Sequence, residues 1–352
     1  MNLIPIKSVS FKLVLLSLMH FVTDGLCSYL VFAKLYPDNP SNAFTVFFLY
    51  NILAFVTQSP IGMLIDKYNK PKLFLAISMG AMLIGYAFSE VWFVSVTLIG
   101  ISNSFFHVAG GKYVTDKSGN DISHLGIFVS TGAIGLMLGQ RCHSFTLMPY
   151  IFFAVLIICG LLMIFSCDSE TKTYSEEYKA KDKATIAILA VIAVVFIRSF
   201  VGKVVSPDFT PSGLMFLFIA LATALGKSIG GVCAKLNGIR PTTYVSMVIA
   251  AICLTFGVGN EIAFVLGVFA FNFTMPITLY FANVLLKGRE GFAFGTLAAS
   301  LTPGYFIAMS FTYSLTMRIL TAVFCVLSML IIVIVSKKVS NYDSSVTVDG
   351  NS

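Results

Sequence analysis

The chain has 352 residues, of which 57% are hydrophobic and only 11% are charged. Soluble domains carry roughly 25% charged residues, so the composition excludes a water-soluble globular protein and indicates a helical bundle in a lipid bilayer. The net charge of +7 does not indicate a nucleic-acid partner, because the basic residues gather in short alternate loops. The seven cysteines lack metal-ligand spacing, and we expect neither a metal nor another cofactor.

Twelve apolar segments approach the length of about 20 residues that a helix needs to cross a bilayer. In chain order these predicted spans are residues 11–36, 41–66, 73–88, 91–112, 122–140, 147–166, 184–206, 211–234, 243–258, 262–286, 291–311 and 317–335. The charged stretch 167–183 predicts a cytoplasmic linker between an N-terminal half (1–166) and a C-terminal half (184–338), and the polar residues 339–352 predict a disordered tail. We expect an all-α membrane protein with twelve transmembrane helices in two pseudo-symmetric six-helix halves.

The basic residues also indicate the orientation of the spans. Most lysines and arginines fall in loops on the same side as the two termini, and few fall on the other side. By the positive-inside rule, both termini are cytoplasmic. We therefore expect a multi-pass protein of the plasma (inner) membrane that works as a monomer in the lipid bilayer.

A short polar turn occurs at the same point in both halves. Residues 62–72 read GMLIDKYNKPK, and residues 230–240 read GGVCAKLNGIR, so a glycine, a lysine, an asparagine and a final basic residue recur at matching positions. The second copy lacks the acid, because Ala234 stands where the first copy has Asp66. A basic turn repeated in two apolar halves is typical of a duplicated transporter whose halves rock around a central site.

The first turn, the central charged linker and the six-plus-six spans resemble the major facilitator superfamily over nearly the whole chain. In that family the turn glycine lets two helices approach closely, and the acid with its basic neighbours forms a charge latch on the cytoplasmic face. The resemblance assigns this gating role to Gly62, Asp66, Lys67, Lys70 and Lys72. Gly135 and Gly139 of the fifth span are similar to the glycine-rich fifth helix of many members, often exporters, although small residues four apart also allow plain close packing.

A narrower resemblance is to the fosmidomycin-resistance branch of the superfamily. It rests on residues 20–24 (HFVTD), on residues 58–62 (QSPIG) and on the pair Phe106 and His107. Members of the branch usually have a proline after this histidine, whereas here Val108 follows it. The identity of the substrate is therefore not transferred from the branch.

Three ionisable residues at membrane depth are candidates for proton coupling. A charged group there costs about 2.5–3.5 kcal/mol on insertion scales, so it marks function or pairing. His20 and Asp24 are four residues apart and share a helix face, where a carboxylate and an imidazole can hold a proton; the alternative is a structural hydrogen bond. His107 has Asn103 four residues before it on the same face, and a functional and a structural role are open for it.

Two cations at membrane depth indicate an anionic substrate. Arg198 lies near the middle of the seventh span and Lys227 lies deep in the eighth, so cations outnumber Asp24, and a surplus of positive charge favours an anion. The alternative is that Arg198 pairs with Asp24 and Lys227 reaches a helix end. Lys203 lies beside the same pathway or extends to the outer interface.

Further polar residues on the spans are candidates to contact the solute. We expect substrate contacts from Arg198, Lys227, Asn103, Asn272, Tyr280, Gln58, Asn51 and Lys203. Prolines at 276 and 303 interrupt the tenth and eleventh spans, where helices bend or expose backbone to a ligand. Packing kinks without a ligand explain these breaks equally well.

These observations predict a secondary active transporter rather than an enzyme. It would be proton-coupled and would move a small organic, phosphorylated or phosphonate anion by alternating access, as symporter or antiporter. No phosphate-binding loop of the ATPase type occurs in the sequence, so ATP is not expected to drive it.

Three alternative functions stay open. A multidrug or antibiotic efflux antiporter would have a wider, more aromatic cavity, which the 33 phenylalanines permit. A flippase for an anionic lipid would need similar buried cations. A receptor or scaffold without transport is the third alternative, and the buried charges argue against it.

Overall fold

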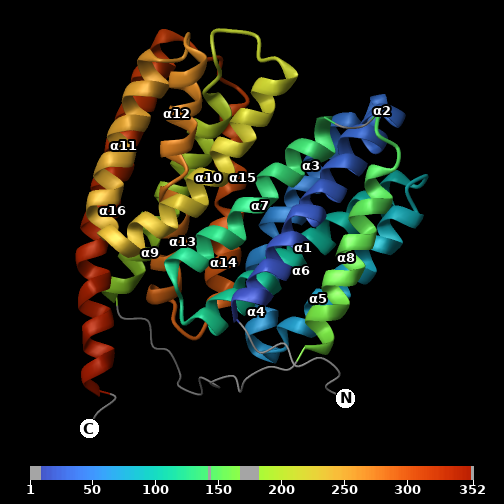
Figure 1. Cartoon of the computed structure of the whole chain (residues 1–352), viewed down its shortest axis with the longest axis horizontal. Helices are drawn as coiled ribbons and strands as arrows, with labels where there is room; N and C mark the ends of the chain where they lie inside the picture. The colour runs from blue at the N-terminus through green and yellow to red at the C-terminus, as the bar shows by residue number, and fades with distance from the viewer. Residues whose placement is uncertain (1–8, 142–143, 167–181, 350–352) are drawn as a thin grey trace. The chain divides into compact units, whose positions relative to one another are not determined.

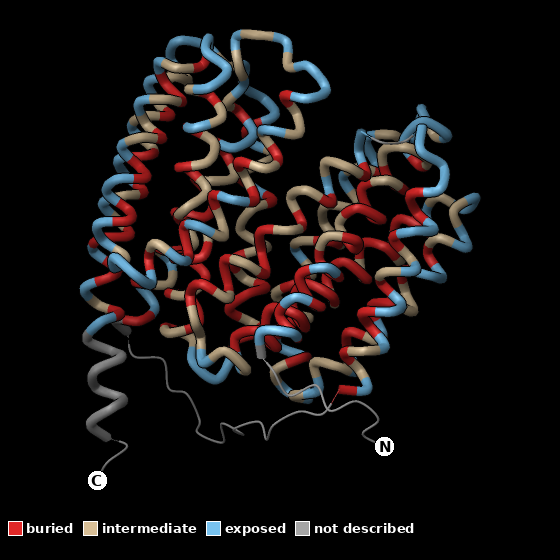
Figure 2. Tube along the Cα trace, viewed as in Figure 1, coloured by how far each residue is buried: buried red, intermediate tan, exposed pale blue. Residues whose placement is uncertain are grey.

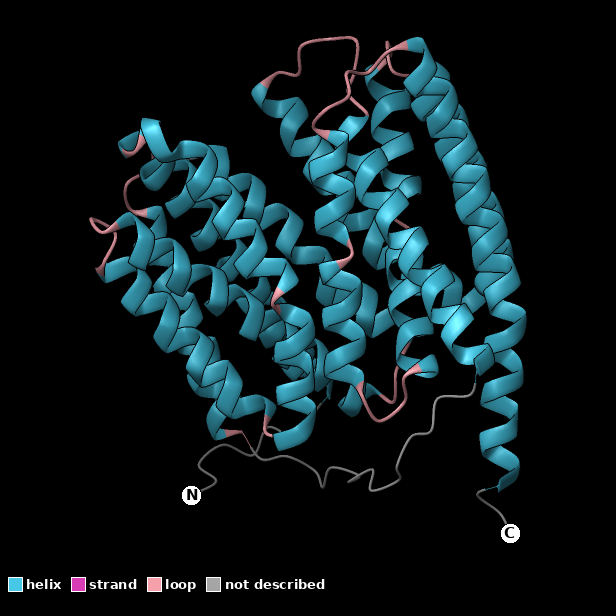
Figure 3. Cartoon of the chain, turned by 180° about the vertical axis from the view of Figure 1, so that it is seen from behind, coloured by secondary structure: helices cyan, strands magenta, loops and turns pink. Residues whose placement is uncertain are grey.

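The computed structural model describes residues 9–141, 144–166 and 182–349, and within these ranges it consists of helices and short loops without a strand (Figure 3). The predicted all-α class is therefore confirmed. Ten helical stretches of the described residues are long and apolar enough to cross a membrane, and some of them join consecutive labelled helices, such as Glu261–Leu285. The apolar helix α5 (Pro71–Ala87) is shorter. The count of twelve spans stays a prediction. The predicted linker lies almost wholly outside the described residues.

The residues of the chain group by their contacts into two compact units. Unit 1 comprises Met1–Gly119, Ile127–Tyr174 and Arg289–Ala299, and unit 2 comprises Asn120–Gly126, Ser175–Gly288 and Ser300–Ser352. Each unit thus includes a short segment from the other half of the sequence. The predicted boundaries of the two halves stay a prediction.

Unit 1 is built mainly from the first part of the chain (Figure 1). Its helices are α1 (Val9–Tyr29), α2 (Tyr36–Asp38), α3 (Ala43–Asn51), α4 (Gln58–Tyr68), α5, α6 (Trp92–Ser118), α7 (Ile122–Arg141, from Ile127 onward), α8 (Met148–Phe165) and α14 (Glu290–Ala299). Two π-helical segments, Leu30–Leu35 and Ile52–Val56, extend α1 and connect α3 to α4. Such segments are rare and often occur at functional sites.

Unit 2 contains most of the later helices and the first turn of α7. Its helices are α9 (Asp182–Val204), α10 (Gly213–Asn237), α11 (Ile239–Phe256), α12 (Glu261–Phe271), α13 (Thr274–Leu285), α15 (Leu301–Ala308) and α16 (Leu315–Asp349). A break after α12 precedes Pro276, and a break at Ser300 precedes Pro303, because proline removes a helix hydrogen bond. The backbone of α16 continues to Asp349, into the predicted tail.

The two repeated turns end their helices in related ways. Asn69 closes α4 with a φ of 48°, and Gly238 closes α10 with a φ of 90°. Positive φ suits glycine, and asparagine tolerates it better than most residues. Pro71 then begins α5, where its missing N–H costs nothing. Asn69 can therefore end α4 in the left-handed conformation without a glycine.

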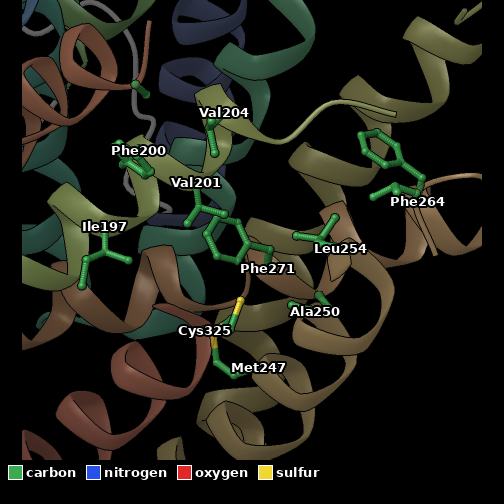
Figure 4. Packing of buried hydrophobic residues seen from close by; sticks show 13 residues of the cluster. Ile197, Phe200, Val201, Val204, Met247, Ala250, Leu254, Phe264, Phe271 and Cys325 are labelled. Carbon is green, nitrogen blue, oxygen red and sulfur yellow. The ribbon is translucent and has the colours of Figure 1, made fainter. Parts of the chain in front are cut away.

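The helices bury one stripe and expose another, as Figure 2 shows along both units. In unit 2 the buried stripe includes Phe200 of α9, Leu254 of α11, Phe271 of α12 and Cys325 of α16, which pack together (Figure 4). Large apolar side chains are exposed elsewhere, and Phe256 is 82% exposed. Water would disfavour such a surface, whereas lipid accommodates it.

Candidate functional site

A cluster of four polar side chains lies at membrane depth in unit 1. We call His20, Asp24, Asn103 and His107 the His–Asp cluster. Asp24 Oδ2 lies 3.3 Å from His20 Nε2, and Asp24 Oδ1 lies 3.4 Å from His107 Nε2. Asn103 Nδ2 donates to Asp24 Oδ1 at 3.1 Å. The structure therefore brings together on one carboxylate the residues that the sequence singled out on two separate helices, α1 and α6.

Backbone carbonyls fix the two imidazole rings of the cluster. The carbonyl of Phe128 accepts from His20 Nδ1 at 2.7 Å, and the carbonyl of Asn103 accepts from His107 Nδ1 at 2.9 Å. A carbonyl only accepts, so the Nδ1 atom of each ring carries a proton. The Nε2 atom of each ring consequently faces the Asp24 carboxylate. The Asp24 side chain keeps 14% of its surface exposed, whereas that of His20 keeps 5%.

Glycines of α7 allow α1 to lie close to that helix in unit 1. A Cβ at Gly135 would overlap the carbonyl oxygen of Phe21, and a Cβ at Gly139 would overlap that of Gly25. A Cβ at Gly132 would overlap Asp24 Oδ2 and His20 Nε2. These contacts support the packing interpretation of the glycine-rich span, and they add Gly132 as a residue that borders the cluster.

A cavity of about 340 Å³ lies in unit 2. Three of the residues predicted to contact substrate line it, namely Arg198 from α9, Lys227 from α10 and Asn272, which follows α12. Most of the remaining lining is apolar, with Val201, Ile219, Phe264, Phe271 and Met275 among it. The cavity thus combines cationic groups with a largely apolar wall, as small-molecule sites commonly do.

Arg198 has few partners for a cation at membrane depth. Its Nη1 donates to Thr278 Oγ1 at 3.2 Å. In the described part of the chain no carboxylate lies within ion-pair distance of its guanidinium. Asp24 belongs to unit 1, so the pairing of Arg198 with Asp24 stays an alternative. A guanidinium has five N–H donors, so this group retains capacity for an anion.

Four other predicted contact residues lie outside both sites. Lys203 is exposed and lies over the ring of Tyr305, 5.4 Å from its centroid, as expected for a side chain that extends to an interface. The Tyr280 carbonyl accepts from Asn120 at 3.4 Å. In unit 1, Asn51 and Gln58 donate to carbonyls one turn earlier, at 2.8 and 2.7 Å. These four do not line the cavity.

The acid of the first repeated turn binds the start of α14. Asp66 accepts from the backbone N–H groups of Gly291 and Phe292, at 2.9 and 2.8 Å, where the helix N-terminus favours an anion. Lys112 lies 3.3 Å from Asp66 and also approaches Glu290 at 3.4 Å. A further carboxylate near Lys112 is that of Asp116, at 3.3 Å.

The three lysines of the first turn differ in their surroundings, and their gating role stays a prediction. Lys67 and Lys70 are exposed, and Lys72 donates to the carbonyl of Ser166 at 2.6 Å. Lys112 instead supplies the cation beside Asp66. Sequence reasoning missed Lys112 and Glu290 because they lie far from the turn in the chain. The only signal was that each is a charge at the end of a predicted span.

The second repeated turn forms an ion pair with different residues. Lys235 pairs with Asp121, which precedes α7. Asp121 Oδ1 accepts from the backbone N–H of Ser123 at 2.9 Å, so it caps this helix. Burial opposes its ionisation, but Lys235 and Ser123 lower the pKa of Asp121 to about 2. Ala234 therefore does not leave the second turn without a charge contact.

The chain is similar to a known protein family and to solved structures of the same fold. A model described as Major Facilitator Superfamily matches residues 38–203, a little less than half of the chain. The Escherichia coli fucose:proton symporter FucP has a TM-score of 0.65 at 12% identity, over 94% of this chain and 99% of that one. The chain has the major facilitator fold. No curated protein sequence matches it significantly.

Two further solved structures have the same fold. The human organic anion transporter MFSD10 (TETRAN) has a TM-score of 0.67 at 14% identity, over 92% of this chain and 99% of that one. A bacterial homologue of the iron transporter ferroportin, solved in an outward-facing state with soaked iron, has a TM-score of 0.60 at 13% identity, over 96% and 100%. At such identities the likeness concerns the fold alone. The narrower resemblance to the fosmidomycin-resistance branch stays a prediction.

Proposed function

We propose that the chain is a member of the major facilitator superfamily and a secondary active transporter for a small anionic solute. The observation that carries the proposal is the cavity of unit 2, in which Arg198 lacks a carboxylate partner among the described residues. An unpaired cation at membrane depth is costly unless a ligand or a counter-charge neutralises it. A solute carboxylate or phosphate would serve as that counter-charge and would form charge-assisted, bidentate hydrogen bonds with the guanidinium.

The composition of the cavity supports a small solute with one anionic end. Lys227 lines the same cavity as Arg198 and adds positive potential, while Asn272 offers an uncharged amide. A volume of about 340 Å³ is near the lower end of the range that ligand sites cover. A small organic, phosphorylated or phosphonate anion is therefore the class of solute that we assign to it.

We assign the driving force to the proton gradient and the coupling role to Asp24, His20 and His107. A carboxylate between two imidazoles can bind and release a proton as its surroundings change. Each proton that crosses is worth about 2.3 kcal/mol per 100 mV of membrane potential, which suffices to concentrate a solute. The fucose transporter of the same fold is by its name a proton symporter, and this likeness is compatible with the assignment.

The charge contacts at Asp66 suit a gating role for the first turn. Asp66 and Lys112 hold the start of α14 within unit 1, and a contact of a few hydrogen bonds can break and form again during alternating access. We place the protein in the plasma (inner) membrane as a monomer, with both termini in the cytoplasm.

Uptake into proteoliposomes tests the proposal. We expect labelled small anions to accumulate when a proton gradient is imposed and not in its absence. Arg198→Ala should abolish accumulation, Arg198→Lys should retain part of it, and Lys337→Ala, which removes an exposed cation of α16, should leave it unchanged. Asp24→Asn should uncouple transport from the gradient. Accumulation that survives in Arg198→Ala would contradict the proposed solute site.

An efflux antiporter for drugs is the second candidate function. The apolar part of the cavity wall, with Phe264 and Phe271 in it, favours this alternative because aromatic side chains offer a large apolar contact area to an amphipathic molecule. Resistance profiling of an expressing strain separates the two candidates. Raised resistance to cationic or neutral drugs, without anion uptake, would favour the antiporter.

A further inference from the structure

We propose that His20, Asp24 and His107 form a binding site for one divalent transition-metal ion. The ligand atoms of the three side chains lie within 4.8 Å of one another. The proposal rests on the geometry of this cluster and not on the identity of the transported solute. It departs from the expectation of no metal, which rested on the absence of metal-ligand spacing in the sequence, because His107 lies far from His20 and Asp24 in the chain.

The protonation pattern of the rings points to a cation between these groups. Both Nδ1 atoms donate to backbone carbonyls, so each neutral ring turns the lone pair of Nε2 toward the Asp24 carboxylate. Lone pairs that face carboxylate oxygens repel one another unless a positive charge lies between them. Protons on both Nε2 atoms would remove the repulsion by turning the rings into cations. A metal ion would remove it by accepting the lone pairs of the rings and of the carboxylate.

The distances match a metal-binding geometry. The Nε2 atoms of His20 and His107 lie 3.3 and 3.4 Å from their respective Asp24 oxygens. Ligands at Zn–N and Zn–O distances of about 2.0–2.1 Å on a tetrahedron are about 3.3–3.4 Å apart. The two rings face different oxygens of Asp24 and the ligand atoms lie within 4.8 Å of one another, so a bound metal ion would draw the rings closer together.

The rings are held as metal-ligating histidines are held in other proteins. A ligating histidine usually donates its second ring N–H to a carbonyl or carboxylate, which fixes its orientation. His20 does so to Phe128 on α7, and His107 does so to Asn103 on its own helix. The ligand atoms thus meet from two helices, and a third helix holds one of them in place.

Asn103 supplies an independent observation that points to a ligand. Its residue is 1% exposed, and its Oδ1 has no hydrogen-bond partner among the described residues. A buried acceptor without a partner destabilises the folded state, because it has lost its hydrogen bonds to water. A rotation of this amide exchanges Oδ1 with Nδ2, which lies 3.1 Å from Asp24. The oxygen then becomes a fourth ligand, and only a cation makes its approach to the carboxylate favourable.

The donor set selects the class of metal. Two imidazoles and one carboxylate suit Zn²⁺, Mn²⁺, Fe²⁺ or Co²⁺, whereas Mg²⁺ and Ca²⁺ prefer oxygen ligands alone. Gly132 of α7 leaves the ligating atoms uncovered, because a Cβ there would overlap both Asp24 Oδ2 and His20 Nε2. The site would bind the metal in competition with protons, since bound ligands must be deprotonated.

Metal titration of the purified full-length protein tests this proposal. The protein is freed of any histidine tag, treated with a chelator and titrated with Co²⁺ and Zn²⁺ by visible absorption and calorimetry, with Mg²⁺ for comparison. We expect one Co²⁺ per chain with a tetrahedral spectrum, displacement by Zn²⁺, and no binding of Mg²⁺. Asp24→Asn and His107→Gln should abolish binding, and Asn103→Ala should weaken it about 10- to 100-fold.

A matched control separates the cluster from other histidines. His124 of α7 lies outside the cluster, and His124→Gln should bind Co²⁺ as the unchanged protein does. Thermal unfolding without metal verifies that each variant folds, and Gly132→Ser provides a variant with all ligands intact that should lose binding. Co²⁺ binding that persists in the doubly substituted His20→Gln and His107→Gln protein, or no binding by the unchanged protein, would overturn the proposal.

Transport assays keep this proposal distinct from the proposed function. Anion uptake measured in chelator-treated buffer tests the transporter, and metal titration in detergent tests the site. A protein that binds Co²⁺ at the cluster but accumulates no anion would contradict the proposed function alone. A protein that accumulates anions but binds no metal would contradict the metal site alone.

Discussion

In both repeated turns a glycine lets two backbone segments approach closely, but the charged residues around the two turns differ. In unit 1, Gly62 of α4 faces the backbone of Gly291, and Asp66 accepts from two N–H groups of α14. In unit 2 the matching Gly230 of α10 faces the backbone of Phe273, and the next residue, Gly231, faces that of Ile122 on α7. The second turn has no acid of its own, and its Lys235 pairs with Asp121, the residue that precedes α7.

The difference concerns how deeply each charge contact is buried. The side chains of Lys112 and Asp66 are 6% and 10% exposed, whereas that of Lys235 is 52% exposed. A buried ion pair is costly to break, and an exposed one contributes little. The charge contact at the first turn is therefore the stronger of the two. The second turn is held mainly by close packing and by the cap that Asp121 forms on α7.

Removal of the acid from the first turn should have the largest effect. Asp66→Ala leaves the N–H groups of Gly291 and Phe292 without an acceptor and Lys112 with one carboxylate fewer. We expect a loss of about 2–4 kcal/mol in the free energy of unfolding, measured by denaturation in detergent. Asp66→Asn keeps one acceptor and should lose less. Equal losses for both variants would mean that the hydrogen bonds to α14 contribute little.

Filling the two glycine contacts should have the next largest effects. A Cβ at position 62 meets backbone atoms of Gly291, and a Cβ at 231 meets the Ile122 carbonyl at 2.6 Å. Gly62→Ala should cost about 1–3 kcal/mol, and Gly231→Ala should cost somewhat less. Thermal unfolding measures both.

Gly80 of α5 is the matched control for these substitutions. Nothing lies within 4 Å of a Cβ at this position, so Gly80→Ala should stabilise the helix by about 0.5–1 kcal/mol. A loss at Gly80 as large as that at Gly62 would show that the effect is not a matter of helix contact.

The helix cap of unit 2 should contribute about as much as caps do elsewhere. Asp121→Ala removes the acceptor for the Ser123 N–H and should cost about 1 kcal/mol. Asp121→Asn keeps the cap and loses only the charge, so its midpoint of thermal unfolding should lie near that of the unchanged protein. Similar losses in both variants would assign the stability to the ion pair instead.

Removal of the exposed lysine should have the smallest effect. The pKa of Asp121 is lowered from 3.8 to about 2, so its contribution to stability is present above pH 3.8 and is lost as the pH falls through 2. Lys235→Ala should raise this pKa and cost less than about 1 kcal/mol at pH 7. High salt should reduce the difference between variant and unchanged protein, measured as unfolding midpoints. A difference that salt leaves unchanged would contradict an electrostatic cause.

Much of the fold could be predicted because its causes are local in the sequence. Apolar length predicts spans, and Pro276 and Pro303 follow the two observed helix breaks because proline removes a backbone donor. The pairing of His20 with Asp24 follows from helix geometry, since side chains four residues apart lie on one face. Such features need no knowledge of how distant segments meet.

The rest depends on contacts between distant segments. Nothing in the sequence around Asp66 indicates that α14 supplies its hydrogen-bond donors, because residue 291 is separated from it by most of the chain. The approach of His107 to Asp24 likewise depends on how α6 packs against α1. Tyr280, Lys203 and Arg198 were all predicted to contact the solute, but only the packing of unit 2 decides which of these side chains line its cavity.

The most direct test of the account is stabilisation of the purified protein by small anions. A ligand that binds only the folded state raises the unfolding midpoint in proportion to the logarithm of its concentration. We predict that organic or phosphorylated anions raise the midpoint of the unchanged protein and leave that of Arg198→Ala where it was. Stabilisation by cationic or neutral amphiphiles alone, equal in both proteins, would contradict the anion site.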